Sequence, residues 1–186
     1  MAEAGSRQHA PSSAHYPISP LIRFTLVGLY LALVLPLPML APPELSIWMW
    51  GALAVGLILI AAMLSEQVVL GPNGIAVGHP RWCSWLIRRG WRLSWSEITS
   101  LVPITTSQGG TVYYVRCMQG KHVLLPQRLE RFSDFLQRFQ QASGVDTKGI
   151  GRITPLWTYW TLAGLSLLLL AGEAAVVARA QLLLIS

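Results

Sequence analysis

The sequence predicts a membrane protein of mixed α and β structure. Of its 186 residues, 53% are hydrophobic and only 12% are charged, and the mean hydropathy is +0.48. Soluble globular proteins carry about 25% charged residues, so these values exclude a simple cytosolic enzyme. We expect an N-terminal transmembrane helical hairpin, an antiparallel β-sheet or β-barrel domain capped by one C-terminal helix, and then a third transmembrane helix.

Three long segments without a charge carry this prediction. They are residues 24–43, 45–65 and 153–172, with 20, 21 and 20 residues. A helix rises about 1.5 Å per residue, so roughly 20 residues cross a hydrocarbon core of roughly 30 Å. The alternative for the first segment is a signal peptide, but Pro36 to Ala41 lacks the small-residue cleavage pattern. We therefore expect three membrane helices and no cleavage.

The first two helices are expected at about 21–35 and 45–64, after a disordered cytoplasmic tail over residues 1–19 that is rich in Ser, Ala, Pro and His. Four prolines between the helices indicate a short, stiff connector, because proline cannot continue a helix. The transmembrane hairpin then covers residues 20–65. Within it, Ala52 and Gly56 form a small-residue step that suits packing inside the hairpin or against a partner helix.

Residues 66–144 change to short apolar runs separated by turn signals, which predicts a β-rich domain. We expect strands at 67–70, 75–77, 91–95, 98–105, 111–118 and 121–125. After Pro126 the apolar spacing becomes helical, which predicts an amphipathic helix over 128–143 that ends at Gly144. Residues 145–155 form a linker, and residues 156–186 form the third membrane helix with a short tail on the far side.

The distribution of charge predicts the orientation. Residues 66–152 contain 11 basic and five acidic side chains. The hairpin connector contains one charged residue, the acid Glu44. Cytoplasmic segments beside membrane helices carry the excess of Lys and Arg. We therefore expect an integral protein of the plasma or thylakoid membrane. Its N-terminus and soluble domain would be cytoplasmic, and its C-terminus would lie on the far side.

The domain resembles the small pleckstrin-homology-like (PH-like) domains of bacterial membrane proteins. The residues that carry this resemblance are Leu70, Gly74-Ile75-x-Val77, Leu93-x-Trp95-x-Glu97-Ile98-x-x-Leu101, Val123-Leu124-Leu125-Pro126 and the Phe-rich helix 132–139. The resemblance implies a small barrel capped by its final helix. The order of hairpin, β-rich domain and third helix is also loosely similar to cyanobacterial and plastid assembly factors for photosynthetic complexes. One fold serves many functions, so neither likeness assigns one.

A segment rich in Trp and Arg is the first candidate site. Trp side chains prefer headgroup depth, and each basic residue beside an anionic leaflet contributes about 1 kcal/mol. The alternative is that Trp85 and Trp91 pack inside the domain. We therefore expect contact with membrane lipids or an acidic partner through Arg81, Trp82, Trp85, Arg88, Arg89 and Arg92.

The last membrane helix contains two charged residues, Glu173 and Arg179. A spacing of six residues places the two side chains about 120° apart around the helix axis, so they are poorly placed to form an ion pair with each other. Glu173 would instead contact another helix or a partner protein, among small residues that allow close approach. The alternative is a carboxylate at the membrane boundary, surrounded by headgroups.

The sequence contains no recognisable catalytic, cofactor-binding or metal-binding motif, and membrane tethering explains its basic charge without nucleic acid. We therefore expect no catalytic residues, no cofactor and no metal. The function expected is that of a non-enzymatic accessory protein, an assembly or stability factor for a larger membrane protein complex, with photosynthetic complexes as one candidate. The alternative is a small subunit of a membrane enzyme or transporter.

Overall fold

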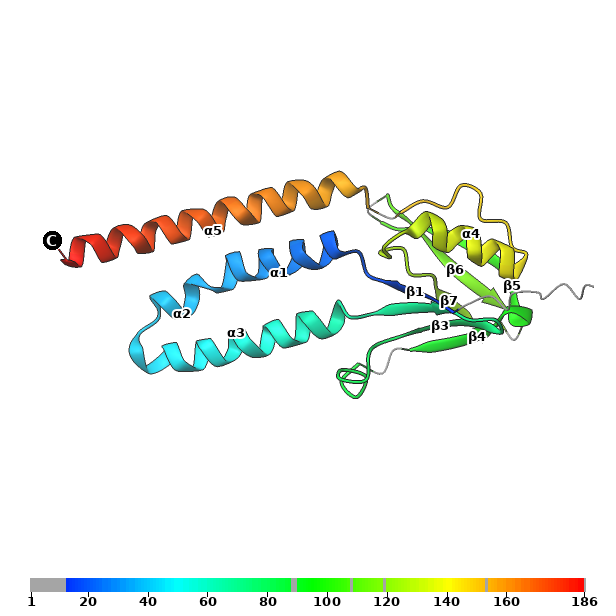
Figure 1. The fold of residues 1–186 in the computed structure, drawn as a ribbon, viewed down its shortest axis with the longest axis horizontal. Coiled ribbons are helices and arrows are strands. Elements are labelled where there is room, and N and C mark those ends of the chain that lie inside the picture. Colours follow the sequence, from blue (N-terminus) through cyan, green and yellow to red (C-terminus); the bar gives the residue numbers. More distant parts are fainter. Residues whose placement is uncertain (1–12, 88–89, 108, 119, 153, 186) are drawn as a thin grey trace, which may run out of the picture. The chain divides into compact units, whose positions relative to one another are not determined.

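The computed structural model describes residues 13–87, 90–107, 109–118, 120–152 and 154–185. The chain divides into two compact units. Met1–Pro17 and Glu66–Ile153 form a β-rich unit, and Ile18–Ser65 and Thr154–Ser186 form a helical unit. Figure 1 shows both, with helices and antiparallel strands as the sequence predicts.

The helical unit contains the three helices that are long and apolar enough to cross a membrane. It consists of α1 (Pro20–Val34), α2 (Pro36–Leu40), α3 (Pro43–Met63) and α5 (Leu156–Ile185). One expectation is wrong: the Pro-rich connector is itself helical over α2. Proline is tolerated in the first turn of a helix, because a backbone N–H at that point has no hydrogen-bond acceptor within the helix. The break between α2 and α3 therefore narrows to Ala41 and Pro42.

Helix α1 packs against both α3 and α5 (Figure 1). On the α5 side, the Thr25 hydroxyl donates a hydrogen bond to the Tyr159 carbonyl at 3.3 Å. On the α3 side, the Tyr30 hydroxyl donates to the Leu53 carbonyl at 2.9 Å. Gly56, one turn along α3, leaves room for the Tyr30 ring, because an added Cβ would overlap the Tyr30 hydroxyl. This is the internal hairpin contact that the small-residue step predicts.

We expect Gly56→Ala to displace the Tyr30 hydroxyl from Leu53 and to weaken the hairpin. Hydrogen bonds between membrane helices contribute about 0.6 kcal/mol on average. The matched control is Gly51→Ala, where an added Cβ meets nothing within 4 Å. In detergent, Gly56→Ala should lower the midpoint of thermal unfolding and Gly51→Ala should not. In a Tyr30→Phe background, Gly56→Ala should lower the midpoint by a smaller amount. Equal effects at both glycines would contradict this packing.

The first sheet of the β unit has the strand order β1-β2-β3-β4, and all neighbouring strands are antiparallel. Alternate residues of each strand face the core, among them Val68, Ile75 and Leu93. The strands are β1 (Ala14–Pro17), β2 (Gln67–Leu70), β3 (Gly74–Gly78) and β4 (Trp91–Ser94). The turn between β2 and β3 lies where Gly71-Pro72-Asn73 predicts it.

The second sheet has the antiparallel order β5-β6-β7. Its strands are β5 (Ile98–Thr105), β6 (Thr111–Cys117) and β7 (His122–Leu124). A short 3-10 turn, Trp95–Glu97, joins it to the first sheet. In the described part of the chain the strands form these two open sheets, and they do not close into one barrel.

Helix α4 (Phe132–Ser143) supplies the apolar side chains that fill the core between the sheets. Phe135 and Phe139 are fully buried, and the Trp95 ring meets Phe139 edge to face at a centroid distance of 5.8 Å. The helix begins later than the predicted residue 128, because Arg131 adopts a left-handed backbone with φ 46°. It ends as predicted at Gly144, whose φ of 72° suits a C-terminal glycine.

The expected disordered tail over residues 1–19 is wrong for its last part. Residues 14–17 form β1, which pairs with β2 along its whole length. Tyr16 is 1% exposed, and its hydroxyl donates a hydrogen bond to the Asp134 carboxylate of α4 at 2.6 Å. The backbone of Glu130 also donates to the Pro17 carbonyl at 2.8 Å. One buried ring, one hydrogen bond to α4 and one to the turn before it order a segment whose composition is typical of disorder. Residues 1–12 lie outside the described residues.

Tyr16→Ala is expected to destabilise the β unit by about 3–5 kcal/mol, the usual cost of deleting a large buried ring. Tyr16→Phe keeps the ring and should cost much less. His15→Ala is the matched control, because His15 is exposed on the other face of the same strand. Chemical denaturation of the full chain in detergent, followed by near-UV circular dichroism, measures these differences. A Tyr16→Ala variant as stable as His15→Ala would show that β1 does not contribute to the fold.

Candidate functional site

The predicted Trp/Arg segment begins as a compact turn between β3 and β4. The Pro80 carbonyl accepts hydrogen bonds from the backbone N–H groups of Cys83 and Ser84 at 3.1 and 3.0 Å. The Cys83 carbonyl in turn accepts from Leu86 and Ile87 at 3.0 and 3.1 Å. Cys83 is 1% exposed, so its buried side chain anchors the turn. We call residues 80–87 the Trp loop.

Two indole rings lie on the surface of the Trp loop. Trp82 is 53% exposed and Trp85 is 74% exposed, and the Trp85 indole N–H donates to the Trp82 carbonyl at 2.9 Å. The alternative of a core position is therefore wrong for Trp85. It is confirmed for Trp91, which is partly buried against the core of the β unit. The loop thus exposes two aromatic side chains, with Arg81 also exposed beside them.

The remaining predicted residues of this segment divide into two groups. Arg88 and Arg89 lie outside the described residues. Arg92 lies on β4, where it is exposed and pairs in register with Ala76 of β3. The structure therefore places Arg81, Trp82 and Trp85 together in the loop, and Arg92 on the strand that follows it.

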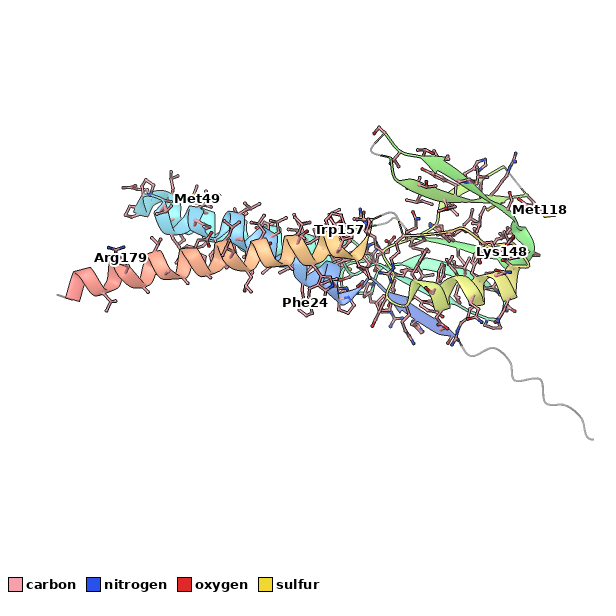
Figure 2. The ribbon with its side chains drawn as sticks, turned by 90° about the horizontal axis from the view of Figure 1, so that it is seen from above. Phe24, Met49, Met118, Lys148, Trp157 and Arg179 are labelled. Atoms are coloured by element: carbon pink, nitrogen blue, oxygen red, sulfur yellow. The ribbon has the colours of Figure 1, made fainter. Side chains whose placement is uncertain are left out.

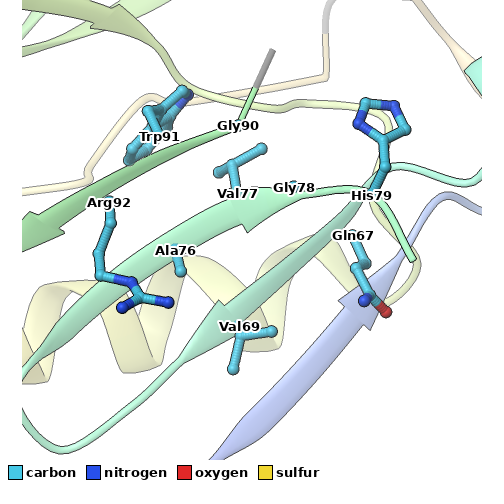
Figure 3. Close-up of a pocket in the computed structure, with 9 residues that line it drawn as sticks. All are labelled: Gln67, Val69, Ala76, Val77, Gly78, His79, Gly90, Trp91 and Arg92. Carbon is cyan, nitrogen blue, oxygen red and sulfur yellow. The ribbon is translucent and has the colours of Figure 1, made fainter. Parts of the chain in front are cut away.

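Sequence reasoning missed a groove at the end of β3 and β4 (Figure 3). It has a volume of about 430 Å³ and takes its side chains from three neighbouring strands. Gln67, His79 and Arg92 supply its polar groups, and Ala76 and Gly78 are among its small residues. The groove forms because strand pairing brings these residues together: Gln67 lies opposite Gly78, and Ala76 lies opposite Arg92. The sequence alone does not give this register.

A half-buried acid, Glu66, lies near His79, which lines the groove. Burial raises the pKa of the Glu66 carboxyl above its usual value, and the nearby charges of His79 and Arg128 offset part of this rise. The Nδ1 atom of His79 is buried and has no hydrogen-bond partner in the described part of the chain. Such an atom is costly unless a water or ligand satisfies it.

The raised pKa of Glu66 predicts a pH dependence of stability. The folded state holds this proton more tightly than the unfolded state. The resulting stabilisation is complete below the unfolded pKa of about 4.3 and is lost as the pH rises through the folded value. Glu66→Gln cannot ionise and should not lose stability as the pH rises. The difference in thermal midpoint, Glu66→Gln minus wild type, should therefore increase from pH 4 to pH 7. Glu130→Gln serves as the control, and a constant difference across this range would contradict the burial of a charged carboxylate.

The second pair of predicted residues lies on α5. Glu173 is partly buried, and its Oε2 atom is shielded without a hydrogen-bond partner among the described residues. Arg179 is exposed and lies towards the end of the helix opposite Trp157 (Figure 2). In the described part of the chain the ion pair is Arg138–Asp134, at 3.4 Å. Glu173 and Arg179 are therefore unpaired, as their spacing predicts.

The described residues contain no group of three or more His, Cys, Asp or Glu side chains arranged to hold a metal ion. Cys83 and Cys117 are both buried and are not joined in a disulfide. What the β unit does offer is exposed indoles, guanidinium groups and an open groove. These groups suit binding to an amphiphilic anionic surface through Trp stacking at headgroup depth and Arg–phosphate hydrogen bonds.

Comparison with known proteins found one relative of this chain. It is an uncharacterized protein of the cyanobacterium Synechocystis, slr0269, which is 40% identical over 168 residues. The match covers 87% of this chain and 84% of that protein. No family model matches the chain. No solved structure matches it either.

Proposed function

The chain belongs to the family of this Synechocystis protein, and from that premise we propose that it is a non-enzymatic accessory protein of a membrane protein complex. It assists the assembly or the stability of that complex. The cyanobacterial relative is compatible with a thylakoid location and makes photosynthetic complexes the first candidates. The β unit faces the cytoplasm in this proposal, because most basic residues of the chain lie in it.

The exposed surfaces of the helical unit are the observation that carries this proposal. Within the most apolar window of each predicted span, only 17%, 11% and 6% of the residues are buried inside the chain. Large apolar side chains such as Trp48, Leu168 and Val176 are at least 70% exposed. Three helices with so little internal burial offer most of their surface to lipid or to other membrane subunits.

Glu173 supports a protein partner in particular. Ionisable residues within membrane helices usually face a partner group rather than lipid. The neighbours of Glu173 on α5 are small, namely Ala171, Gly172, Ala174 and Ala175, so a second helix can approach closely at this point. A subunit that donates a hydrogen bond to the Glu173 carboxylate fits this surface.

The β unit contributes the second half of the proposal. Its Trp loop lies in the headgroup region or against a cytoplasmic subunit of the complex, with Arg81 and Arg92 facing anionic groups. We also propose a PH-like arrangement for this unit. Two antiparallel sheets that share one core with a C-terminal helix support it, through side chains such as Val68, Val115 and Phe135.

Affinity purification of the full chain from membranes in mild detergent tests the accessory role. We expect a multi-subunit membrane complex to co-purify with the wild-type chain, and Glu173→Ala to lower its recovery at least severalfold. Leu168→Ala is the control, because Leu168 is exposed on the same helix without a polar group. Recovery of the wild-type chain alone and monomeric would overturn the proposal. Co-purification of an enzyme or transporter whose turnover requires this chain would favour the subunit alternative.

The double variant Trp82→Ala, Trp85→Ala tests the contribution of the Trp loop. We expect the protein to fold, because both rings are largely exposed, and the complex to be recovered at a lower level. Met118→Ala is the matched control, since Met118 is 75% exposed in the turn that follows β6. Unchanged recovery of the complex would show that the Trp loop does not contribute to docking.

A further inference from the structure

The strand residues on the outward face of the first sheet include no acid. The side chains that alternate with the core residues on its four strands are small or polar, and we call them the outer face: His15, Pro17, Gln67, Val69, Gly74, Ala76, Gly78, Arg92 and Ser94. Arg92 is the one Lys or Arg among these residues. A face with this composition attracts anions and has too little apolar area to bind a helix by burial.

Two polar groups of the groove have no partner in the part of the chain that the structure describes. There, neither the Gln67 amide nor the Arg92 guanidinium makes a side-chain hydrogen bond or an ion pair. Figure 3 shows the Arg92 side chain reaching back over Ala76, with Val69 and Gln67 on the same side of the strands. Five N–H donors of a guanidinium and two of an amide thus border an open space.

Two small residues, Ala76 and Gly78, keep that space open. Ala76 and Gly78 lie in the centre of the groove, between Gln67 on one neighbouring strand and Arg92 on the other. Because neighbouring strands lie about 4.8 Å apart, Gln67 on β2 and Arg92 on β4 flank β3 across two strand spacings. Both side chains are long enough to reach a phosphate group that lies between them. Gly90 closes the end of the groove tightly, because a Cβ there would lie 3.0 Å from the Val77 carbonyl oxygen.

The chain itself limits how far this groove can be from the membrane helices. Gln67 follows Met63, the last residue of α3, by four residues, and its register partner Pro17 precedes Pro20 of α1 by three. At about 3.3–3.6 Å per residue, these connections reach at most about 14 and 11 Å. The Gln67 end of the groove is therefore the end of the sheet that short connections join to α1 and α3.

We propose that this groove binds the phosphate of an anionic phospholipid headgroup, with Arg92 and Gln67 holding the phosphate oxygens above Ala76 and Gly78. The proposal deepens the headgroup contact proposed above and rests on it. The Glu66 carboxyl lies near His79, which lines this groove. Its burial favours the neutral form of the carboxyl, which limits repulsion of an anion.

The test uses the full chain purified in detergent, with native mass spectrometry to count bound lipid. The chain is titrated with phosphatidylglycerol, with phosphatidylcholine or with inorganic phosphate. We expect the wild-type chain to bind phosphatidylglycerol selectively. Arg92→Gln should bind this lipid about tenfold more weakly, because it loses one charge-assisted hydrogen-bond pair. Arg116→Gln is the matched control, since Arg116 is exposed on the second sheet.

A second variant, Gly78→Leu, fills the groove without changing its charge. An added Cβ at Gly78 meets nothing within 4 Å, so the variant should fold and should bind less phosphatidylglycerol than wild type. Equal binding of phosphatidylglycerol by wild type, Arg92→Gln and Gly78→Leu would overturn the proposal. So would saturation by inorganic phosphate with no preference for the lipid, which would assign the groove to a soluble anion.

The result is independent of the accessory role. If the complex co-purifies with the wild-type chain while both groove variants bind lipid normally, the proposed function stands and the groove proposal fails. If both variants lose the lipid and no complex co-purifies, the groove proposal stands and the accessory role fails. Loss of a co-purified subunit in Arg92→Gln with unchanged lipid binding would show that the face binds protein instead.

Discussion

The short covalent connections between the membrane helices and the first sheet are the constraint on which the rest depends. Two residues, Ile18 and Ser19, separate β1 from α1, and three residues, Leu64 to Glu66, separate α3 from β2. Because β1 and β2 are paired in register, both connections leave from the same end of one sheet. The hairpin is therefore joined covalently to that end of the sheet at two adjacent strands.

This constraint links features that are otherwise unrelated. The Trp loop leaves β3 after Gly78, which lies directly opposite Gln67 at the tethered end of the sheet. The groove opens at the same register position, and the half-buried Glu66 belongs to the connection itself. Trp82 and Trp85 are exposed in the loop, and exposed indoles are suited to the region between hydrocarbon and water. The headgroup contact that we propose for the Trp loop and the groove rests on these features.

Much of the architecture follows from local sequence patterns. Uncharged runs predict all three membrane helices, alternation predicts most strands, and the spacing of Leu129, Phe132, Leu136 and Phe139 predicts α4. The errors lie where a tertiary contact overrides local preference. Residues 14–17 look disordered until Tyr16 packs against α4, and the Pro-rich connector looks extended although Pro36 suits the first turn of a helix. The groove was not predictable, because it depends on the register of three strands and on side chains that are absent at Gly78 and Gly90.

The depth of the Trp loop in a bilayer tests the central claim most directly. An environment-sensitive fluorescent amino acid placed at Ser84, between the two exposed Trp residues, reports on the loop in the full chain. The same probe at Ser107, exposed beyond β5, is the reference. After reconstitution into bilayers containing phosphatidylglycerol, the account predicts blue-shifted emission and quenching by lipid-borne quenchers at Ser84 only. Equal, fully aqueous emission at both positions would contradict a β unit held with its Trp loop at the membrane surface.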